Sequence, residues 1–367
     1  MIRRNSRKCL LTDFAMNGSG SSSMNSSGVL WWSGWSNGYP IYLTLAFTVM
    51  QPVCVLLGLL GNFWIICLLL FRSSSIHVTF TIKLYYWAIA IGDILACLKH
   101  LFWNVICITF ALYSANRVYF CISVLSSTSC VLIQIFGCIS ETLSNYTVVG
   151  LTIERFIAVC LPLKAHSLLT SRWTIFILLM LTVPICIYFT ALVPFSVLVY
   201  PAMQVPGLSC GTNSGALGTV YSFSIVVILC IVHAFAVLVL LLFIFVRLRQ
   251  ESNNRRALSA ASNTHNKQTK IGTTVTLTMI ALASLTILTY GLNSISNVIN
   301  TILFYIPGVN LQFQTISSQI LFFFRLSTII SHCANFFIYL AFIPSFKRAA
   351  FCFLSSNIFK SSSTTHT

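Results

Sequence analysis

Long apolar segments, separated by short polar ones, occupy most of the chain. A helix needs about 20 consecutive apolar residues to cross roughly 30 Å of hydrocarbon. Seven segments reach or nearly reach this length, at residues 40–71, 80–108, 126–160, 172–199, 217–247, 271–303 and 314–343. The pattern therefore predicts an all-α membrane protein built as a seven-transmembrane helix bundle.

Two of these segments carry polar residues at helical spacing. The sets are Gln134, Gly137, Glu141, Ser144 and Val148 on the third segment, and Arg325, Thr328, His332, Asn335 and Tyr339 on the seventh. Residues three or four apart share one face of a helix, and an ionisable side chain inside a membrane is costly unless it is shielded from lipid. Both stripes are therefore expected to face the interior of the bundle.

The composition supports a membrane location. The chain of 367 residues is 57% hydrophobic and 7% charged, too little charge to cover a soluble globule. With the N-terminus outside, the basic residues of the loops and of the C-terminal tail fall in the cytosol, as the positive-inside rule requires, although Arg3, Arg4, Arg7 and Lys8 oppose it. The net charge of +16 then indicates topology and attraction to anionic membrane lipid, and not nucleic-acid binding.

Three regions follow from these patterns. Residues 1–39 form a flexible extracellular tail rich in Gly, Ser and Asn, without a signal peptide, in which Asn17 and Asn25 are glycosylation sequons. Residues 40–343 form the membrane domain, and residues 344–367 follow it on the cytoplasmic side. Cys352 lies next to the membrane in this last region and is a candidate for palmitoylation.

Glu141 and Arg325 are ionisable residues at similar predicted depth. Each lies fourteen residues outward of a cytoplasmic helix end, at Arg155 and Tyr339, which corresponds to about 21 Å at 1.5 Å per residue. Two interpretations remain open. The residues form a structural ion pair, because an unpaired buried charge is costly, or one of them is the counter-charge of a ligand.

Several short motifs resemble those of rhodopsin-like (class A) G protein-coupled receptors. Glu154-Arg155-Phe156 ends the third segment, Gly61-Asn62 lies in the first and Asp93 in the second, and "NFFIY" ends the seventh, before "FKR". The "NFFIY" ending is similar to that of invertebrate FMRFamide-like peptide receptors. The resemblance also implies that residues 344–367 form a short amphipathic membrane-surface helix with a cytoplasmic tail. The chain departs from the family in lacking a proline in the fifth segment and Cys-Trp-x-Pro in the sixth, and Phe336 replaces the proline of the seventh.

The resemblance implies roles for four groups of residues. Glu154, Arg155, Phe156, Asn335 and Tyr339 would switch coupling to a heterotrimeric G protein, and Cys130 would form a disulfide with Cys210, with Cys121 as the rival partner. The ligand-facing candidates are Gln134, Glu141, Arg325, His100 and Tyr290. A sodium ion would lie among Asn62, Asp93, Ser144, Ser331 and Asn335; the alternative is a hydrogen-bonded polar core without an ion.

The sequence thus predicts a plasma-membrane receptor, with no enzymatic activity, that binds an extracellular ligand and activates G proteins. The ligand is interpreted as a neuropeptide; the alternative is a small acid or lipid attracted by Arg325 and Lys99. A transporter or channel is less well supported, since the chain shows no internal repeat and no helix broken by Gly or Pro. The cysteines and histidines show no metal-binding spacing, and no cofactor is predicted apart from the sodium ion.

Overall fold

The computed structural model describes residues 49–76, 78–102, 126–201, 208–212, 216–258, 266–305 and 311–352. All of them belong to one compact unit, Ile41–Thr367. The sequons at Asn17 and Asn25 lie outside the described residues, as does most of the predicted cytoplasmic tail.

Helices form nearly all of the described chain, and they coincide with the predicted apolar segments. The long helices are α3 (Gln51–Phe71), α4 (Phe80–His100), α6 (Ser127–Cys160), α8 (Ser171–Ser196), α10 (His233–Leu258), α11 (Asn266–Tyr305) and α12 (Leu311–Phe342). The short ones are η2 (Ser73–Ser75), α7 (Pro162–Leu168), α9 (Ala216–Ser224) and η5 (Ile225–Val232), of which η5 is π-helical and leads directly into α10.

Five helical stretches of the described chain are long and apolar enough to cross a membrane. They are Gln51–Phe71, Phe80–His100, Ser171–Ser196, Ala216–Asn253 and Thr274–Ser296. A sixth is added if Leu326–Phe342 and the helix Pro344–Cys352, bent by 99° from it, count as one span. The structure is therefore that of a helical protein with several membrane-length helices.

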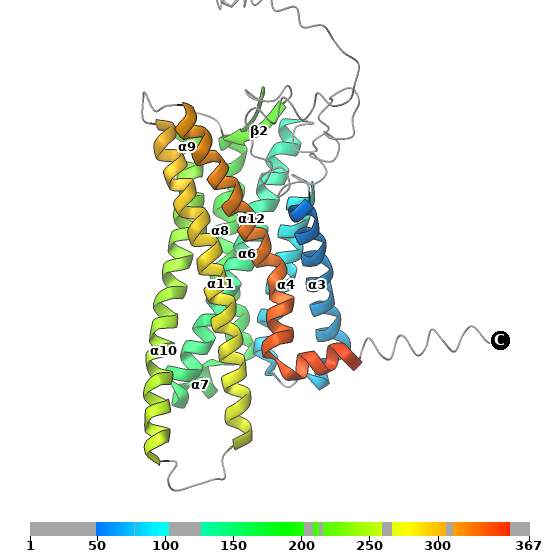
Figure 1. Cartoon of the computed structure of the whole chain (residues 1–367), viewed down its shortest axis with the longest axis vertical. Coiled ribbons are helices and arrows are strands. Elements are labelled where there is room, and N and C mark those ends of the chain that lie inside the picture. The colour runs from blue at the N-terminus through cyan, green and yellow to red at the C-terminus, as the bar shows by residue number, and fades with distance from the viewer. Residues whose placement is uncertain are drawn as a thin grey trace, which may run out of the picture. The chain divides into compact units, whose positions relative to one another are not determined.

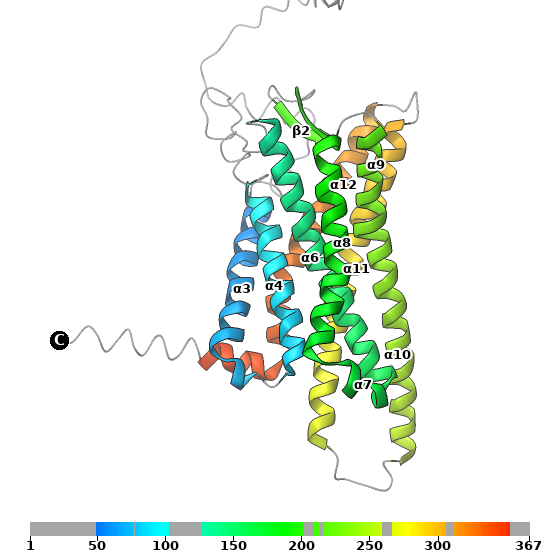
Figure 2. The same ribbon diagram turned by 180° about the vertical axis from the view of Figure 1, so that it is seen from behind.

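Helix α6 is long enough to span a membrane but is more polar than these five. It begins at a capping box, in which the Ser126 hydroxyl accepts the Ser129 N–H and the Ser129 hydroxyl accepts the Ser126 N–H, both at 3.0 Å. Its buried residues include several Ser, Thr and Asn side chains together with Glu154 and Arg155. Helix α6 packs against α4, α8 and α10 (Figure 2). Because these polar side chains are buried, they face protein and not lipid.

The helices form a closed set of contacts around the core. Helix α3 packs against α4 and α12, α12 against α11, α11 against α10, α10 against α6, and α6 against α4, while α8 covers α6 from outside (Figure 1). Tyr85, Tyr86, Tyr221 and Tyr339 are among the largest fully buried side chains. Helix α8 instead leaves many apolar side chains exposed, as expected of a face that meets lipid.

The prediction of an all-α fold is incomplete, because the structure contains one β-hairpin. Strand β1 (Val197–Pro201) pairs with β2 (Leu208–Thr212) in an antiparallel sheet, with Val199 opposite Cys210. The hairpin contacts α6 near its first turns (Figure 1). The apolar residues of β1 continue the apolar run of α8, so the sequence pattern alone does not separate the strand from the helix.

The helix Pro344–Cys352 follows α12 after a sharp turn (Figure 1). It buries Ser345, Phe346, Ala349 and Ala350 and exposes Lys347, Arg348, Phe351 and Cys352. The helix thus has one face that packs on the protein. Its contact with a membrane surface, and palmitoylation at the exposed Cys352, stay predictions.

Candidate functional site

Asp93, on α4, is the centre of a buried polar core. Its Oδ1 accepts hydrogen bonds from Ser144 Oγ on α6 at 2.6 Å and from His332 Nδ1 on α12 at 2.7 Å. Its Oδ2 accepts a bond from Asn335 Nδ2, also on α12. Asp93 is 0% exposed, so these three donors provide the stabilisation that water gives a carboxylate in solution.

Gly92 allows α4 and α6 to come close enough for the bond between Asp93 and Ser144. A Cβ atom at Gly92 would lie 2.7 Å from the backbone nitrogen of Ser144 and 2.9 Å from its Cα. Any larger residue would therefore push the two helix backbones apart. The sequence "IGDI" thus places the smallest residue beside the buried acid.

His332 connects this core to two further helices. Its Nε2 is 2.9 Å from the hydroxyl of Tyr290 on α11. Its backbone carbonyl accepts a 2.9 Å bond from Asn62 Nδ2 on α3, and the same amide nitrogen donates to Gly58 O at 2.8 Å. The sequence placed His332 on the polar stripe of the seventh segment but did not assign it to the site. The signal that could have found it is its spacing of three residues from Asn335.

The sodium site predicted at this core does not fit the residues that the structure brings together. Cations such as sodium are held by oxygen atoms whose lone pairs point at the ion. Here the Asp93 oxygens instead accept hydrogen bonds from Ser144, His332 and Asn335. His332, which contributes a nitrogen atom, was not among the residues predicted to hold the ion. Ser331 is buried but adds no bond to Asp93 within the described residues. The alternative interpretation, a hydrogen-bonded core without an ion, matches this geometry.

A second charged group lies nearer the β-hairpin end of the same helices. Lys99 Nζ, on α4, forms an ion pair with Glu141 Oε1, on α6, and the two side chains are 17% and 22% exposed. Gly137 leaves the space for it, because a Cβ at this position would lie 2.7 Å from Lys99 Cε. The structure thus gives Glu141 a partner, Lys99, that the sequence had not indicated. The side chain of Arg325 lies outside the described part of the structure.

The other candidate ligand residues lie in different surroundings. Gln134 Oε1 accepts a weak bond from the Tyr221 hydroxyl at 3.4 Å, and that hydroxyl also lies 3.4 Å from Cys138 Sγ. His100 is the last residue of α4 and is half-buried. Tyr290 is buried and belongs to the polar core through its bond to His332.

Glu154 and Arg155 form a buried ion pair near the far end of α6. Glu154 Oε1 accepts bonds from Arg155 Nη2 at 3.2 Å and from Thr81 Oγ1, on α4, at 2.9 Å. Glu154 is 1% exposed and Arg155 8%. Glu154 Oε2 and Arg155 Nε are buried without a hydrogen-bond partner among the described residues. Glu154 Oε2 can therefore accept, and Arg155 Nε donate, one more hydrogen bond if the helices around the pair rearrange.

Two other predicted switch residues, Phe156 and Tyr339, pack beside this end of the bundle, whereas Asn335 belongs to the polar core. The ring of Phe156 lies edge-on to Phe243 of α10, with centroids 6.1 Å apart. The ring of Tyr339 lies 4.5 Å from Tyr86 and 5.8 Å from Phe346. The hydroxyls of Tyr86 and Tyr339 are buried without a hydrogen-bond partner in the described chain.

A disulfide ties the start of α6 to the hairpin. Cys130 and Cys210 are bonded, with Cα atoms 5.6 Å apart. This is the pair that the family resemblance implied. The rival residue Cys121 lies outside the described residues.

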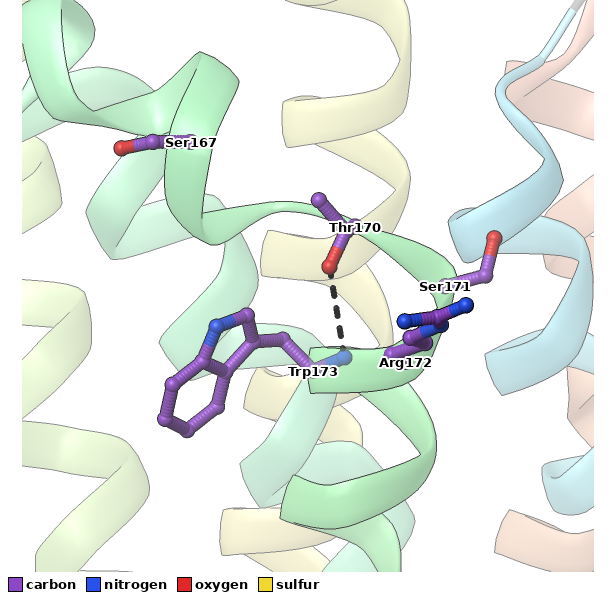
Figure 3. A pocket seen from close by; sticks show the side chains of 5 residues that line it. All are labelled: Ser167, Thr170, Ser171, Arg172 and Trp173. Carbon is purple, nitrogen blue, oxygen red and sulfur yellow. Dashed lines mark hydrogen bonds between the residues drawn. The ribbon is translucent and has the colours of Figure 1, made fainter.

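A shallow pocket of about 570 Å³ lies at the turn between α7 and α8, away from these groups. It is lined by Ser167, Thr170, Ser171, Arg172 and Trp173, and the Thr170 hydroxyl accepts the Trp173 N–H at 3.4 Å (Figure 3). None of these residues was a predicted site residue. Among the described residues, no group of three or more His, Cys, Asp or Glu could hold a metal ion.

No family model matches the chain, and no curated protein matches it.

Proposed function

We propose that the chain is a rhodopsin-like G protein-coupled receptor. It crosses the plasma membrane seven times with its N-terminus outside, binds an extracellular ligand and activates a heterotrimeric G protein. The observation that carries this proposal is the arrangement along α6. Near one end, Glu154 holds Arg155 in a buried ion pair, and near the other, Cys130 is bonded to the β-hairpin.

One continuous helix connects these two places. Cys130 and Arg155 are 25 residues apart in α6, which corresponds to about 37 Å along a helix axis. A displacement at the hairpin end can therefore reach the ion pair through a single rigid element. At rest Glu154 and Thr81 hold the pair, and in the active state the Arg155 guanidinium is released to meet the G protein. Ligand binding shifts the populations of these two states.

The ligand is proposed to act at the charged pair Lys99–Glu141. Both side chains are partly exposed, so a charged group of the ligand can reach them and compete for one partner. Such competition changes the attachment of α4 to α6, the same two helices that are joined at Asp93 and at Glu154. A peptide that carries a charged group is the first candidate. A small acid or an acidic lipid is the second, because its carboxylate would compete with Glu141 for the Lys99 ammonium.

Nucleotide exchange on purified G proteins tests the proposal. Membranes with the wild-type chain, Glu154→Gln and Arg155→Ala at matched surface expression are compared on a panel of G proteins. Glu154→Gln should raise ligand-independent exchange, and Arg155→Ala should abolish it. A library of peptides and small acids then identifies the ligand class.

Two results would contradict the receptor function. One is exchange by Arg155→Ala at the wild-type rate. The other is the absence of exchange on every G protein together with solute flux into vesicles that contain the chain, which would indicate a transporter or channel.

A further inference from the structure

We propose that His332 occupies the place where a cation would balance Asp93, and that the polar core therefore binds no sodium ion. The His332 imidazole bonds to the Asp93 carboxylate in place of an ion. Its removal should create a sodium site that the natural chain lacks.

The first step concerns the Asp93 carboxylate. Oδ1 is shared by Ser144 Oγ at 2.6 Å and His332 Nδ1 at 2.7 Å, and Oδ2 is bonded to Asn335 Nδ2. A carboxylate has about four lone-pair positions, and three of them are used here. A sodium ion would have to approach the same oxygens while the donor groups of His332 and Asn335 point toward it, which is electrostatically unfavourable.

The second step concerns the imidazole ring, whose two nitrogens both have partners. When Nδ1 carries the proton, it donates to Asp93. Nε2 then accepts a hydrogen bond from the Tyr290 hydroxyl, which lies 2.9 Å away. When both nitrogens are protonated, the Tyr290 oxygen accepts instead and the ring is a cation. The ring is satisfied in either state. The ring is 2% exposed. Rotating it away to admit an ion would leave Asp93 and Tyr290 without these bonds.

The third step concerns the anchoring of His332. Its backbone carbonyl is held by Asn62 Nδ2 at 2.9 Å, and Asn335, three residues further along α12, is bonded to Asp93. The backbone at His332 and the side chain of Asn335 are thus both attached to the core. The Cα atom from which the ring extends therefore stays beside the carboxylate as long as α12 keeps its position against α3 and α4.

Removal of the ring should reverse the preference of the core. His332→Ser replaces two nitrogens with one hydroxyl and leaves a space between Asp93, Ser144 and Asn335. The Asn335 amide can turn its oxygen into this space. One carboxylate with several neutral oxygens suits a weakly bound monovalent cation.

Thermal unfolding of the full chain in detergent tests this inference without a receptor assay, so its outcome is independent of the proposed function. Each protein is heated in sodium chloride or in choline chloride of equal concentration, and the folded fraction is followed by size-exclusion chromatography. The wild type should unfold at the same temperature in both salts. His332→Ser should unfold roughly 2–4 °C higher in sodium. The double variant Asp93→Asn, His332→Ser should lose this difference.

His332→Phe is the matched control, because it fills the same space without nitrogen atoms. It should be less stable than the wild type in both salts and show no sodium effect. If His332→Ser is not recovered, His332→Asn takes its place.

Two outcomes would overturn the inference. The first is a wild-type chain that sodium stabilises and that loses this effect in Asp93→Asn. The second is a folded His332→Ser or His332→Asn protein that is insensitive to sodium, which would show that the imidazole is not what keeps the ion out.

Discussion

Lys99 on α4 and Glu141 on α6 form an ion pair across the interface of two neighbouring helices. Its two side chains are 17% and 22% exposed, so it is neither a surface ion pair nor a fully buried one. The Lys99 side chain reaches Glu141 across the space that Gly137 leaves open.

Neutralising one member of this pair should destabilise the fold. Lys99→Met or Glu141→Gln is expected to lower the free energy of unfolding by about 1–2 kcal/mol, between the values for exposed and buried pairs. The double variant should be nearly as stable as either single one, because neither charge is then left alone. The measurement is the thermal midpoint of all three variants, with Arg172→Met at an exposed position as the control. Losses that simply add in the double variant would show that the two charges do not interact.

Two helical glycines offer a direct comparison of crowded and open surroundings. Gly92→Ala should destabilise by about 1–3 kcal/mol through overpacking, because its Cβ would meet the Ser144 backbone at 2.7 Å. A Cβ at Gly291 meets no described atom within 4 Å outside the adjoining backbone of its own helix, so Gly291→Ala should be neutral or stabilise by up to about 1 kcal/mol through helix propensity. The measurement is the thermal midpoint of each variant compared with that of the wild type. Equal effects would show that α4 and α6 are not closely packed at Gly92.

The disulfide should contribute strongly to stability, because it closes a loop with a sequence separation of 80. Cys130→Ser, Cys210→Ser and the double variant should each lose about 2–5 kcal/mol, by the same amount, since one bond is lost in every case. Non-reduced peptide mapping should find Cys130 linked to Cys210. Cys160→Ser, at a free and half-buried cysteine, is the control. A linkage of Cys121 to Cys210 would contradict the structure.

Thr81 should restrain the Glu154–Arg155 pair if the chain is a receptor. Thr81→Val keeps the shape of the side chain but removes the 2.9 Å bond to Glu154, and so should raise ligand-independent nucleotide exchange several-fold. Thr152→Val is the matched control, since the Thr152 hydroxyl donates to Val148 O in its own helix, at 2.7 Å, and bonds to no other helix in the part of the chain that the structure describes. Its exchange rate should equal that of the wild type. Equal rates for both variants at matched expression would remove Thr81 from the switch.

The positions of the helices could be predicted from the sequence, because apolar length and helical spacing are local properties of the chain. The predicted segments 80–108 and 126–160 contain α4 and α6, and the polar stripe of the third segment is the face of α6 that carries Glu141 and Ser144. The hairpin was not predicted, since β1 continues an apolar run and its pairing with β2 is a non-local contact.

The partners of the buried polar groups were decided by the tertiary structure. Depth along a helix placed Glu141 and Arg325 at one level, but depth does not specify which neighbouring helix a side chain faces. Helix rotation and the small size of Gly137 let Lys99 reach Glu141. In the same way, Asp93 was predicted to be a buried acid, but only the packing of α12 on α4 made His332 its partner. Spacing fixes the face on which a residue lies, whereas the partner depends on the rotation and separation of two helices, which are set by all of their side chains together.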